Sequence, residues 1–257
     1  KAGGAVHALI GNHEAMNLYG DLRYVSAGEF EAFRDAGSEK ARDELYKIEE
    51  KQHPDRKRWD AEHPLGFAEH RRAFGREGKY GKWIRAHNTV IRIDGTLFLH
   101  GGISPKLAGW SVRQINEKVR EELGDFAKLE GGIVQNENGP LWYRGLAQGN
   151  EKALEDHLRK VLFNYKIERV AIGHTFTDGA IKPRFDGKVL QIDVGLSRFF
   201  DEKGRMACLV IEQGKPCALH RGKKVNLPWN SEGDLRRYLK ETGDLDREAR
   251  SAESPKK

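Results

Sequence analysis

The chain of 257 residues is long enough for one large domain or two small ones with a substantial core. It is polar, with 38% hydrophobic residues and a mean hydropathy of -0.72, and no apolar run approaches the roughly 20 residues of a membrane span, which excludes a membrane-spanning protein. The net charge of +6 suits an anionic substrate, but basic and acidic residues are interspersed, as on an ordinary solvated surface. No zinc-finger, basic-zipper or aromatic-basic repeat favours nucleic-acid binding. We expect a soluble protein, with cytoplasm and periplasm both open.

Short apolar segments alternate with charged helical patterns, which predicts a mixed α/β (α+β) fold rather than a helical bundle. The dipeptide Asp94-Gly95 is typical of a tight turn and predicts a hairpin between two strands. The expected strands are residues 5–10, 87–93, 96–100, 169–172, 189–193, 207–211 and 218–220, and the expected helices are residues 28–36, 38–52, 111–123 and 152–163.

We expect one domain over residues 1–229 and a charged tail over residues 230–257, which would form a loosely attached helix followed by disorder. The domain contains a helical insertion at about residues 38–84, rich in Arg, Glu and aromatic side chains. This insertion either covers the core or caps a functional site. Cys208 and Cys217 would not face each other in a hairpin centred on Gly214-Lys215, so we expect no disulfide.

Three apolar segments end alike, each delivering a polar side chain into a glycine-bounded turn. They are Leu9-Ile10-Gly11-Asn12-His13-Glu14, Leu97-Phe98-Leu99-His100-Gly101-Gly102-Ile103-Ser104-Pro105 and Val170-Ala171-Ile172-Gly173-His174-Thr175. Glycine allows tight turns and a close approach of the backbone to a ligand. Open α/β sheets place their sites at the carboxyl ends of strands. A single histidine after a strand is more often structural than functional, whereas three such segments together predict a site.

These segments resemble motifs of a known family. Gly11-Asn12-His13-Glu14, His100-Gly101-Gly102-Ile103-Ser104-Pro105 and Gly173-His174 resemble the third, fourth and last motifs of the calcineurin-like metallophosphoesterases, in the phosphoprotein phosphatase branch. Residues 12–25 and 139–145 resemble the bacterial Shewanella-like protein phosphatases, and the resemblance covers roughly residues 4–200. It implies a β-sandwich flanked by helices, lacking its first strands in this chain, and a hydrolase that removes phosphate from proteins.

The resemblance also implies two metal ions, Mn, Fe or Zn, of which this chain would hold only the second. Asn12, His100 and His174 would be its ligands, a mixed oxygen and nitrogen set. The two metals together would bind the hydroxide nucleophile. His13 would protonate the leaving oxygen as general acid, because the pKa of imidazole suits that task. Arg144 would bind the phosphate oxygens in a bidentate fork.

Four further residues are weaker candidates. Arg23 and Tyr24 are expected to line the substrate pocket, with a salt-bridged arginine and a packed tyrosine as the equally weighted alternative. Glu14 is expected to hold backbone or a ligand without touching metal. Asp193 ends a strand and is a candidate partner of a ligand histidine. The alternative is that it is an ordinary aspartate at a strand end with no role in the site. The remaining histidines receive no role: His7, His53, His63, His70, His87, His157 and His220.

The sequence departs from the family pattern at two points, and these departures bear on which branch the chain resembles and on how much of the site it contains. Phe176 stands where most calcineurin-like phosphoesterases have the final His of Gly-His-x-His, which the protein phosphatase branch also lacks. The motifs Gly-Asp-x-His-Gly and Gly-Asp-x-x-Asp-Arg-Gly occur nowhere in the sequence. In the family they supply the first metal site, the bridging Asp, the Asp that orients the acid His and a second phosphate-binding Arg. We therefore expect this chain alone to bind metal weakly and to have little phosphatase activity.

Two alternatives stay open. The substrate is either a phosphorylated protein or a small phosphoester, of the diadenosine polyphosphate or nucleotide type. The second alternative is a non-catalytic relative that retains affinity for phosphate or metal. The two absent motifs favour this alternative only if they are absent from the gene as well.

Overall fold

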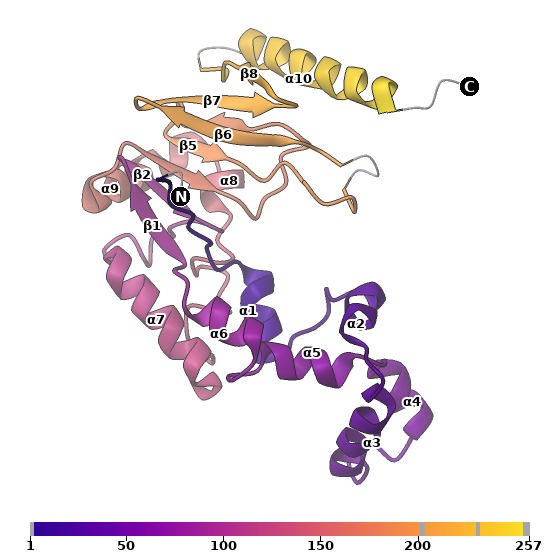
Figure 1. The fold of residues 1–257 in the computed structure, drawn as a ribbon. Coiled ribbons are helices and arrows are strands. Elements are labelled where there is room, and N and C mark those ends of the chain that lie inside the picture. The colour runs from indigo at the N-terminus through magenta and orange to yellow at the C-terminus, as the bar shows by residue number, and fades with distance from the viewer. Residues whose placement is uncertain (1–2, 201–203, 230–231, 254–257) are drawn as a thin grey trace.

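Two β-sheets form the centre of the molecule, with helices outside them and a helical lobe to one side (Figure 1). The computed structural model describes residues 3–200, 204–229 and 232–253. The helices are α1 (Asn12–Tyr19), α2 (Ala27–Phe33), α3 (Ser38–Glu49), α4 (Arg56–Glu62), α5 (Phe67–Phe74), α6 (Lys79–Arg85), α7 (Val112–Gly124), the 3-10 helix η1 (Phe126–Lys128), α8 (Gly145–Gln148), α9 (Glu151–Tyr165) and α10 (Glu232–Glu253). The strands are β1 (Val90–Ile93), β2 (Thr96–Leu99), β3 (Arg169–Ile172), β4 (Lys182–Arg184), β5 (Val189–Gln191), β6 (Ala207–Glu212), β7 (Lys215–His220) and β8 (Lys223–Val225). Among the described helices, none is both long and apolar enough to span a membrane.

Three parallel strands determine where the functional segments meet. The five-stranded sheet has the order β1-β2-β3-β5-β4, in which β2, β3 and β5 run parallel and the outer strands antiparallel. Leu99, the last residue of β2, pairs with Ile172, the last residue of β3, and Ile172 also pairs with Gln191 at the end of β5. The carboxyl ends of these strands therefore lie side by side, so the residues that follow them reach one edge of the sheet.

Successive side chains along a strand point to opposite faces of the sheet, and in this sheet both faces carry apolar side chains. Ile172 of β3 and Val189 of β5 belong to a core shared with α7, α8 and α9. Leu190 belongs to a second core, formed with the three-stranded sheet β6-β7-β8 and with α10. The expected mixed α/β fold is confirmed, as two sheets flanked by helices.

The segment over residues 5–10 differs from the strand expected there. It makes one parallel bridge, between Leu9 and Asn88, in which the Ile10 amide donates to the Asn88 carbonyl at 3.0 Å. Val6 is 98% exposed, while Ile10 is buried against α1, α6 and α7. The prediction was wrong because an apolar run becomes a strand only when a neighbour supplies a ladder of hydrogen bonds. The described residues supply this segment with a single bridge.

Three hairpins each turn on a residue followed by glycine, with positive φ at both positions, which matches the twist of the flanking strands. Asp94-Gly95, with φ of 42° and 72°, confirms the predicted turn. The second hairpin turns on Gln213-Gly214, with φ of 51° and 75°, rather than on Gly214-Lys215, because strand pairing resumes at residue 215. The hairpin of β7 and β8 turns on Arg221-Gly222, with φ of 49° and 81°. Cys217 pairs with Val210, and both cysteines are free thiols, as expected.

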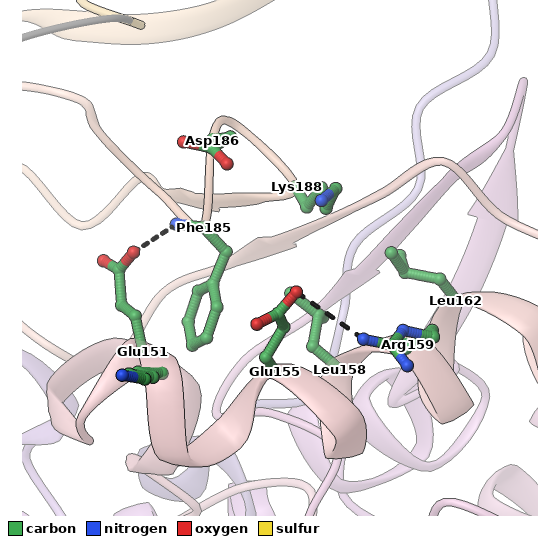
Figure 2. A pocket seen from close by; sticks show the side chains of 9 residues that line it. Glu151, Glu155, Leu158, Arg159, Leu162, Phe185, Asp186 and Lys188 are labelled. Atoms are coloured by element: carbon green, nitrogen blue, oxygen red, sulfur yellow. Dashed lines mark hydrogen bonds and ion pairs between the residues drawn. The ribbon is translucent and has the colours of Figure 1, made fainter.

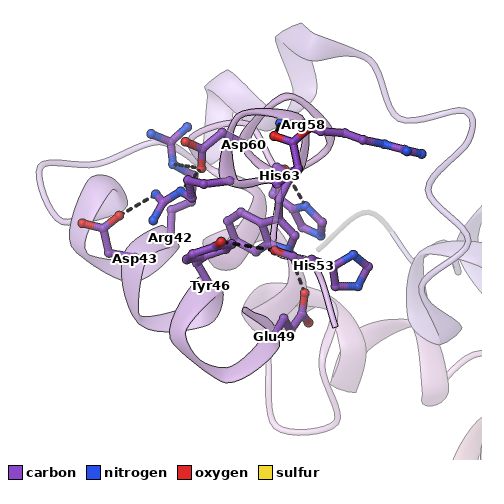
Figure 3. A network of polar contacts seen from close by, with 11 residues as sticks. Arg42, Asp43, Tyr46, Glu49, His53, Arg58, Asp60 and His63 are labelled. Carbon is purple, nitrogen blue, oxygen red and sulfur yellow. Dashed lines mark hydrogen bonds and ion pairs between the residues drawn. The ribbon is translucent and has the colours of Figure 1, made fainter. Parts of the chain in front are cut away.

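Helices α2 to α5 form a lobe that extends away from the sheets, and α5 and α6 connect it to α1 and α7 (Figure 1). A polar and aromatic network holds its outer part together (Figure 3). The Trp59 indole is buried, donates to Glu49 at 2.9 Å and stacks on His63 at 4.1 Å. Arg56 pairs with Asp60 at 2.7 Å. The residues at about 38–84 fold as the helices α3 to α6, of which α5 and α6 contact α1, and α6 also contacts α7. That they form an insertion stays a prediction.

Helix α10 is attached more firmly than the loose tail expected from sequence. Tyr238 and Leu245 are 3% and 8% exposed and belong to the second core. The Asp246 carboxylate accepts a hydrogen bond from Arg221 at 2.8 Å and lies 3.2 Å from His220 Nε2. The many charges between these apolar positions hid the buried face. The disorder expected at the end of the tail falls on residues 254–257, which lie outside the described residues.

Candidate active site

Asn12, His100 and His174 come together at the edge where the strands end. Asn12 opens α1 directly after Gly11, whereas His100 follows β2 and His174 lies two residues beyond β3. The Oδ1 atom of Asn12 lies 2.7 Å from His100 Nε2, which lies 3.0 Å from His174 Nδ1. The three side chains predicted as a ligand set are therefore adjacent through the atoms that can ligate a metal.

Gly11 leaves the space that the imidazole of His100 occupies. A β-carbon at Gly11 would lie 3.0 Å from His100 Nδ1 and 2.6 Å from a carboxylate oxygen of Glu14. The same carboxylate accepts a hydrogen bond from the Gly11 amide at 2.8 Å and caps α1. Glu14 thus holds backbone, one of the two roles expected for it. Packing requires glycine at position 11, because a side chain there would displace His100 or Glu14.

Burial keeps both imidazoles neutral near pH 7. Burial is the largest cause that lowers the pKa of His100 to about 4, and the charges of His13 and Arg144 contribute to the same shift. Burial also lowers the pKa of His174 to about 3, with smaller effects from His100, Arg144 and His13 and an opposing hydrogen bond to the backbone of Trp142. A neutral imidazole keeps the lone pair that a metal ion requires.

The three facing atoms fit a metal ion. Asn12 Oδ1 and His174 Nδ1 both lie within hydrogen-bond distance of His100 Nε2, and the tautomers of the two imidazoles decide which nitrogen carries a proton between them. One amide oxygen and two imidazole nitrogens form a mixed set that Zn, Fe and Mn accept. Across residues 3–200, 204–229 and 232–253, no group of three or more His, Cys, Asp or Glu could hold a metal. The amide of Asn12 therefore completes the set.

His13 lies next to Asn12 in the chain and stacks on Tyr24. The two ring centroids are 4.8 Å apart, and the ring planes differ by 5°. Both side chains are exposed, and together with Phe74 they line a cavity of about 340 Å³. An exposed imidazole at a cavity wall can exchange a proton with a bound molecule. Tyr24 therefore contacts the predicted acid, in addition to lining a cavity.

Arg144 and Trp142 brace the loop that carries His174. Arg144 Nη1 donates to the His174 carbonyl at 2.7 Å and lies 3.0 Å from the hydroxyl of Thr175, to which it also donates. The Trp142 ring stands perpendicular to the imidazole of His174, with centroids 5.6 Å apart, and its indole donates to the Val134 carbonyl at 2.9 Å. Trp142 belongs to the stretch that carries the family resemblance, but no motif in the sequence predicts its contact with His174.

Arg23 and Arg144 line one cavity of about 710 Å³. Asp21 fixes Arg23 through two hydrogen bonds, at 2.8 Å to Nε and 2.5 Å to Nη2, and these bonds hold the pKa of the Asp21 carboxyl below its usual value. Arg23 thus combines both expected alternatives, since it is ion-paired and also lines a pocket. Two guanidinium groups on one cavity favour an anionic ligand. The other lining residues are Tyr19, Asp21, Gln135, Glu137, Asn138, Trp142 and Tyr143.

Asp193 lies beside the loop after β3, and its contacts are with backbone rather than with an imidazole. Its carboxylate accepts from the Gly195 amide at 3.2 Å, and its carbonyl accepts from the amide and hydroxyl of Thr177, both at 2.9 Å. It therefore fastens the loop that carries the ligand histidine instead of orienting that histidine directly. Phe176 stacks on Phe200 at 4.8 Å, a packing role that agrees with its being no ligand.

A third cavity, of about 230 Å³, lies between α9 and the turn that joins β4 to β5 (Figure 2). Leu158 and Phe185 contribute apolar surface to it, and Glu155 pairs with Arg159 beside them at 3.6 Å. All its lining residues come from α9 and that turn, so it is separate from the edge that carries Asn12.

The two packed sheets fit a calcineurin-like phosphoesterase, with His100 and His174 following neighbouring strands and Asn12 beside them at the start of α1. Within this class it resembles the Shewanella-like protein phosphatases in both sequence and fold. No protein-family model matches the chain.

Three curated relatives illustrate the sequence likeness. An uncharacterized protein of Schizosaccharomyces pombe is 31% identical over 242 residues, which cover 88% of this chain and 62% of the relative. Shewanella-like protein phosphatase 2 of Arabidopsis thaliana is 27% identical, with 77% and 55% covered, and Shewanella-like protein phosphatase 1 of Plasmodium berghei is 23% identical, with 89% and 61% covered. The chain thus spans less than two thirds of the length of each relative. These relatives are eukaryotic, so a bacterial origin stays a prediction.

Solved structures share the fold. A mutant cold-active protein tyrosine phosphatase superposes with a TM-score of 0.63 at 25% identity, over 87% of this chain and 59% of that one. A cold-active protein-tyrosine phosphatase of a psychrophilic Shewanella species gives a TM-score of 0.60 at 24% identity, with the same coverage. The expected fold is therefore confirmed over most of the chain.

Proposed function

We propose that the chain is part of a metal-dependent phosphomonoester hydrolase that acts on phosphorylated protein. The observation that carries this proposal is the meeting of Asn12 Oδ1, His100 Nε2 and His174 Nδ1 at 2.7 and 3.0 Å. The similar proteins support it, since two curated relatives are called protein phosphatases and the two solved neighbours are called protein tyrosine phosphatases.

Asn12, His100 and His174 would hold one metal ion, of manganese, iron or zinc. Such an ion, when bound, polarises a phosphoryl oxygen and makes water a stronger nucleophile near neutral pH. The family resemblance implies two ions, and the residues of this chain account for one of them. The low pKa values of both histidines favour this role, because little free energy is needed to keep the imidazoles deprotonated at neutral pH.

His13 supplies the proton that the leaving oxygen needs when the phosphoester bond breaks. The ring is exposed at the wall of the cavity of about 340 Å³, which shares Asp21 with the cavity that Arg23 and Arg144 line, so the leaving oxygen of a substrate bound there can reach it. The parallel ring of Tyr24 limits the orientations that this imidazole can adopt. A held imidazole transfers its proton more effectively than a freely rotating one, because its donor nitrogen is already directed at the oxygen.

Arg144 and Arg23 bind the phosphate group in their shared cavity. Arg144 uses Nη1 for its contacts with the protein, which leaves the remaining N–H groups of its guanidinium to a ligand. Arg23 is aligned by Asp21. Two guanidinium groups held in this way can each donate N–H groups to the oxygens of a phosphate dianion and fix its orientation.

A panel of substrates distinguishes a phosphoprotein phosphatase from an enzyme that acts on small phosphoesters. The cavity of about 710 Å³ has aromatic walls at Tyr19, Trp142 and Tyr143, which suit the side chain of a phosphorylated residue. The protein as its gene encodes it should hydrolyse phosphopeptides with a higher kcat/KM than nucleotides or diadenosine polyphosphates. The opposite preference would favour the small-molecule alternative. Phosphate or metal binding without turnover of either substrate class would favour the non-catalytic relative.

A further inference from the structure

His157 lies on α9, outside the motifs that define the site, and contacts the loop that begins with His100. Its Nε2 atom lies 2.8 Å from the carbonyl oxygen of Ile103, which is fully buried. A carbonyl can only accept, so Nε2 must carry the proton and donate. Burial lowers the pKa of His157, and the ring is therefore neutral near pH 7 and has a single N–H to give.

Helix α9 holds the chain beyond His100 at three points. His157 binds the carbonyl of Ile103, Asn164 donates to the carbonyl of Ala108 at 2.9 Å, and Tyr165 donates to the carbonyl of Leu107 at 2.9 Å. These bonds are similar in type and come from one helix, but they lie at different distances along the chain from the ligand. The bond to Ile103 is the one closest to His100.

The same histidine packs against the loop that carries Arg144. Its ring stands perpendicular to that of Tyr143, with centroids 6.3 Å apart. The Tyr143 ring fills space beside Gly102, where a β-carbon would lie 3.1 Å from Tyr143 Cδ1. The loops are also joined directly, because the Gly101 amide donates to the Pro140 carbonyl at 2.9 Å. His157 therefore lies behind the junction of two loops that both reach the site.

We infer that His157 is a positioning residue: it anchors the loop that carries His100 to α9 and thereby sets the orientation of this imidazole toward Asn12 and His174. The inference rests on the proposed function for its consequence, which is metal affinity. The geometry of the loop itself does not depend on that function. Partners that orient a metal ligand without touching the metal commonly change affinity by roughly 10- to 100-fold when they are removed.

Three variants test the inference. His157→Phe removes the donor and keeps a ring against Tyr143, whereas His157→Gln keeps an N–H donor. Tyr165→Phe is the matched control, because it removes a comparable bond from the same helix at the far end of the loop. Co²⁺ affinity is measured by its visible absorption, and the imidazole ¹H–¹⁵N signals of His100 are recorded without metal. Thermal unfolding of each variant confirms that it is folded.

We expect His157→Phe to weaken Co²⁺ binding by roughly 10-fold or more and to shift the His100 signals. His157→Gln should lie closer to the unmodified protein, and Tyr165→Phe should lower the thermal midpoint while leaving both readouts unchanged. The inference is overturned if His157→Phe matches Tyr165→Phe in both. If the unmodified protein binds no Co²⁺, the proposed function fails, and the His100 signals alone decide the positioning role. If His157→Phe does not fold, His157→Ala replaces it in the same comparison with His157→Gln.

Discussion

His100 Nε2 lies 3.0 Å from His174 Nδ1, although the two residues are 74 positions apart in the chain. The parallel pairing of β2 with β3 causes this meeting, since it aligns the ends of the two strands. Asn12 reaches the same point from the start of α1, with Oδ1 2.7 Å from His100 Nε2. A site assembled from three separate segments depends on the fold, whereas each segment alone could not hold a metal ion.

Removal of one ligand should lower metal content without unfolding the protein. Asn12→Ala or His174→Ala each leaves two donors, so we expect affinity for Mn²⁺ or Zn²⁺ to fall by at least about 10-fold. Metal content after dialysis, measured by inductively coupled plasma mass spectrometry, reports the change. His53→Ala is the control, because His53 is exposed in the helical lobe (Figure 3). Equal metal content in all three variants would contradict the ligand assignment.

Substitution of the predicted acid should separate chemistry from metal binding. In the protein as its gene encodes it, His13→Ala should lower kcat by roughly 10²-fold or more on phosphoesters with poor leaving groups, while metal content persists. The loss should be smaller for p-nitrophenyl phosphate, whose leaving oxygen needs little protonation. Full activity of His13→Ala on phosphopeptides would show that another group donates the proton.

Tyr24 offers a related test. Tyr24→Phe keeps the ring that stacks on His13 at 4.8 Å, whereas Tyr24→Ala removes it. We expect Tyr24→Phe to retain most activity and Tyr24→Ala to lose turnover on poor leaving groups, because its imidazole is no longer held. If the two variants behave alike, the stacking has no part in catalysis. Circular dichroism of both variants checks that the fold is intact.

Arg144→Lys should impair substrate binding although it keeps the positive charge. Lysine cannot reproduce a planar fork. An ammonium group that replaced Nη1 at the His174 carbonyl and the Thr175 hydroxyl would leave no second nitrogen for the phosphate. We expect KM for phosphopeptide to rise by roughly 10-fold, the scale of one lost charge-assisted hydrogen bond. Arg113→Lys is a matched control on the exposed face of α7, where its side chain is 83% exposed. An unchanged KM in Arg144→Lys would remove this arginine from the phosphate site.

Acid should destabilise the helical lobe through His70. This residue is 2% exposed among the rings of Phe30, Phe33 and Phe74, and burial lowers its pKa to about 4, with a smaller effect from Arg71. Because the folded pKa lies below the unfolded value of 6.5, the unfolded state binds the proton first. Stability is therefore lost as the pH falls from about 6.5 to 4, by up to about 3 kcal/mol.

Urea unfolding at pH 7 and pH 5 measures that effect. His70→Phe removes the titrating group, so its free energy of unfolding should change less between the two pH values than that of the unmodified protein. His53→Ala should show the unmodified pH dependence, because His53 is exposed. Parallel pH dependences for His70→Phe and the unmodified protein would contradict the account.

The sequence predicts those features that depend on interactions between residues close together in the chain. Asp94-Gly95 predicts its turn because few residue pairs adopt positive φ twice in succession. The strand ends before His100 and His174 are recognisable because apolar runs stop at glycine-bounded polar residues. These features depend on neighbours in sequence, so the sequence displays them.

Other features depend on partners that are distant in sequence. Residues 5–10 look like a strand but make one bridge, since pairing is set by what lies alongside. Trp142 and His157 show no motif for their roles, because each acts through a contact with a residue far along the chain: His174 for Trp142 and Ile103 for His157. The sequence does not predict the buried face of α10, because the many charged residues of this helix dominate the local composition.

The metal site is tested most directly by anomalous diffraction from crystals grown with Mn²⁺ or Zn²⁺. The account predicts an anomalous peak bounded by Asn12 Oδ1, His100 Nε2 and His174 Nδ1, at about 2.0 to 2.2 Å from each. The same crystals of His174→Ala should lose that peak. Metal bound elsewhere on the protein, with no peak between these three atoms at saturating concentration, would contradict the central claim.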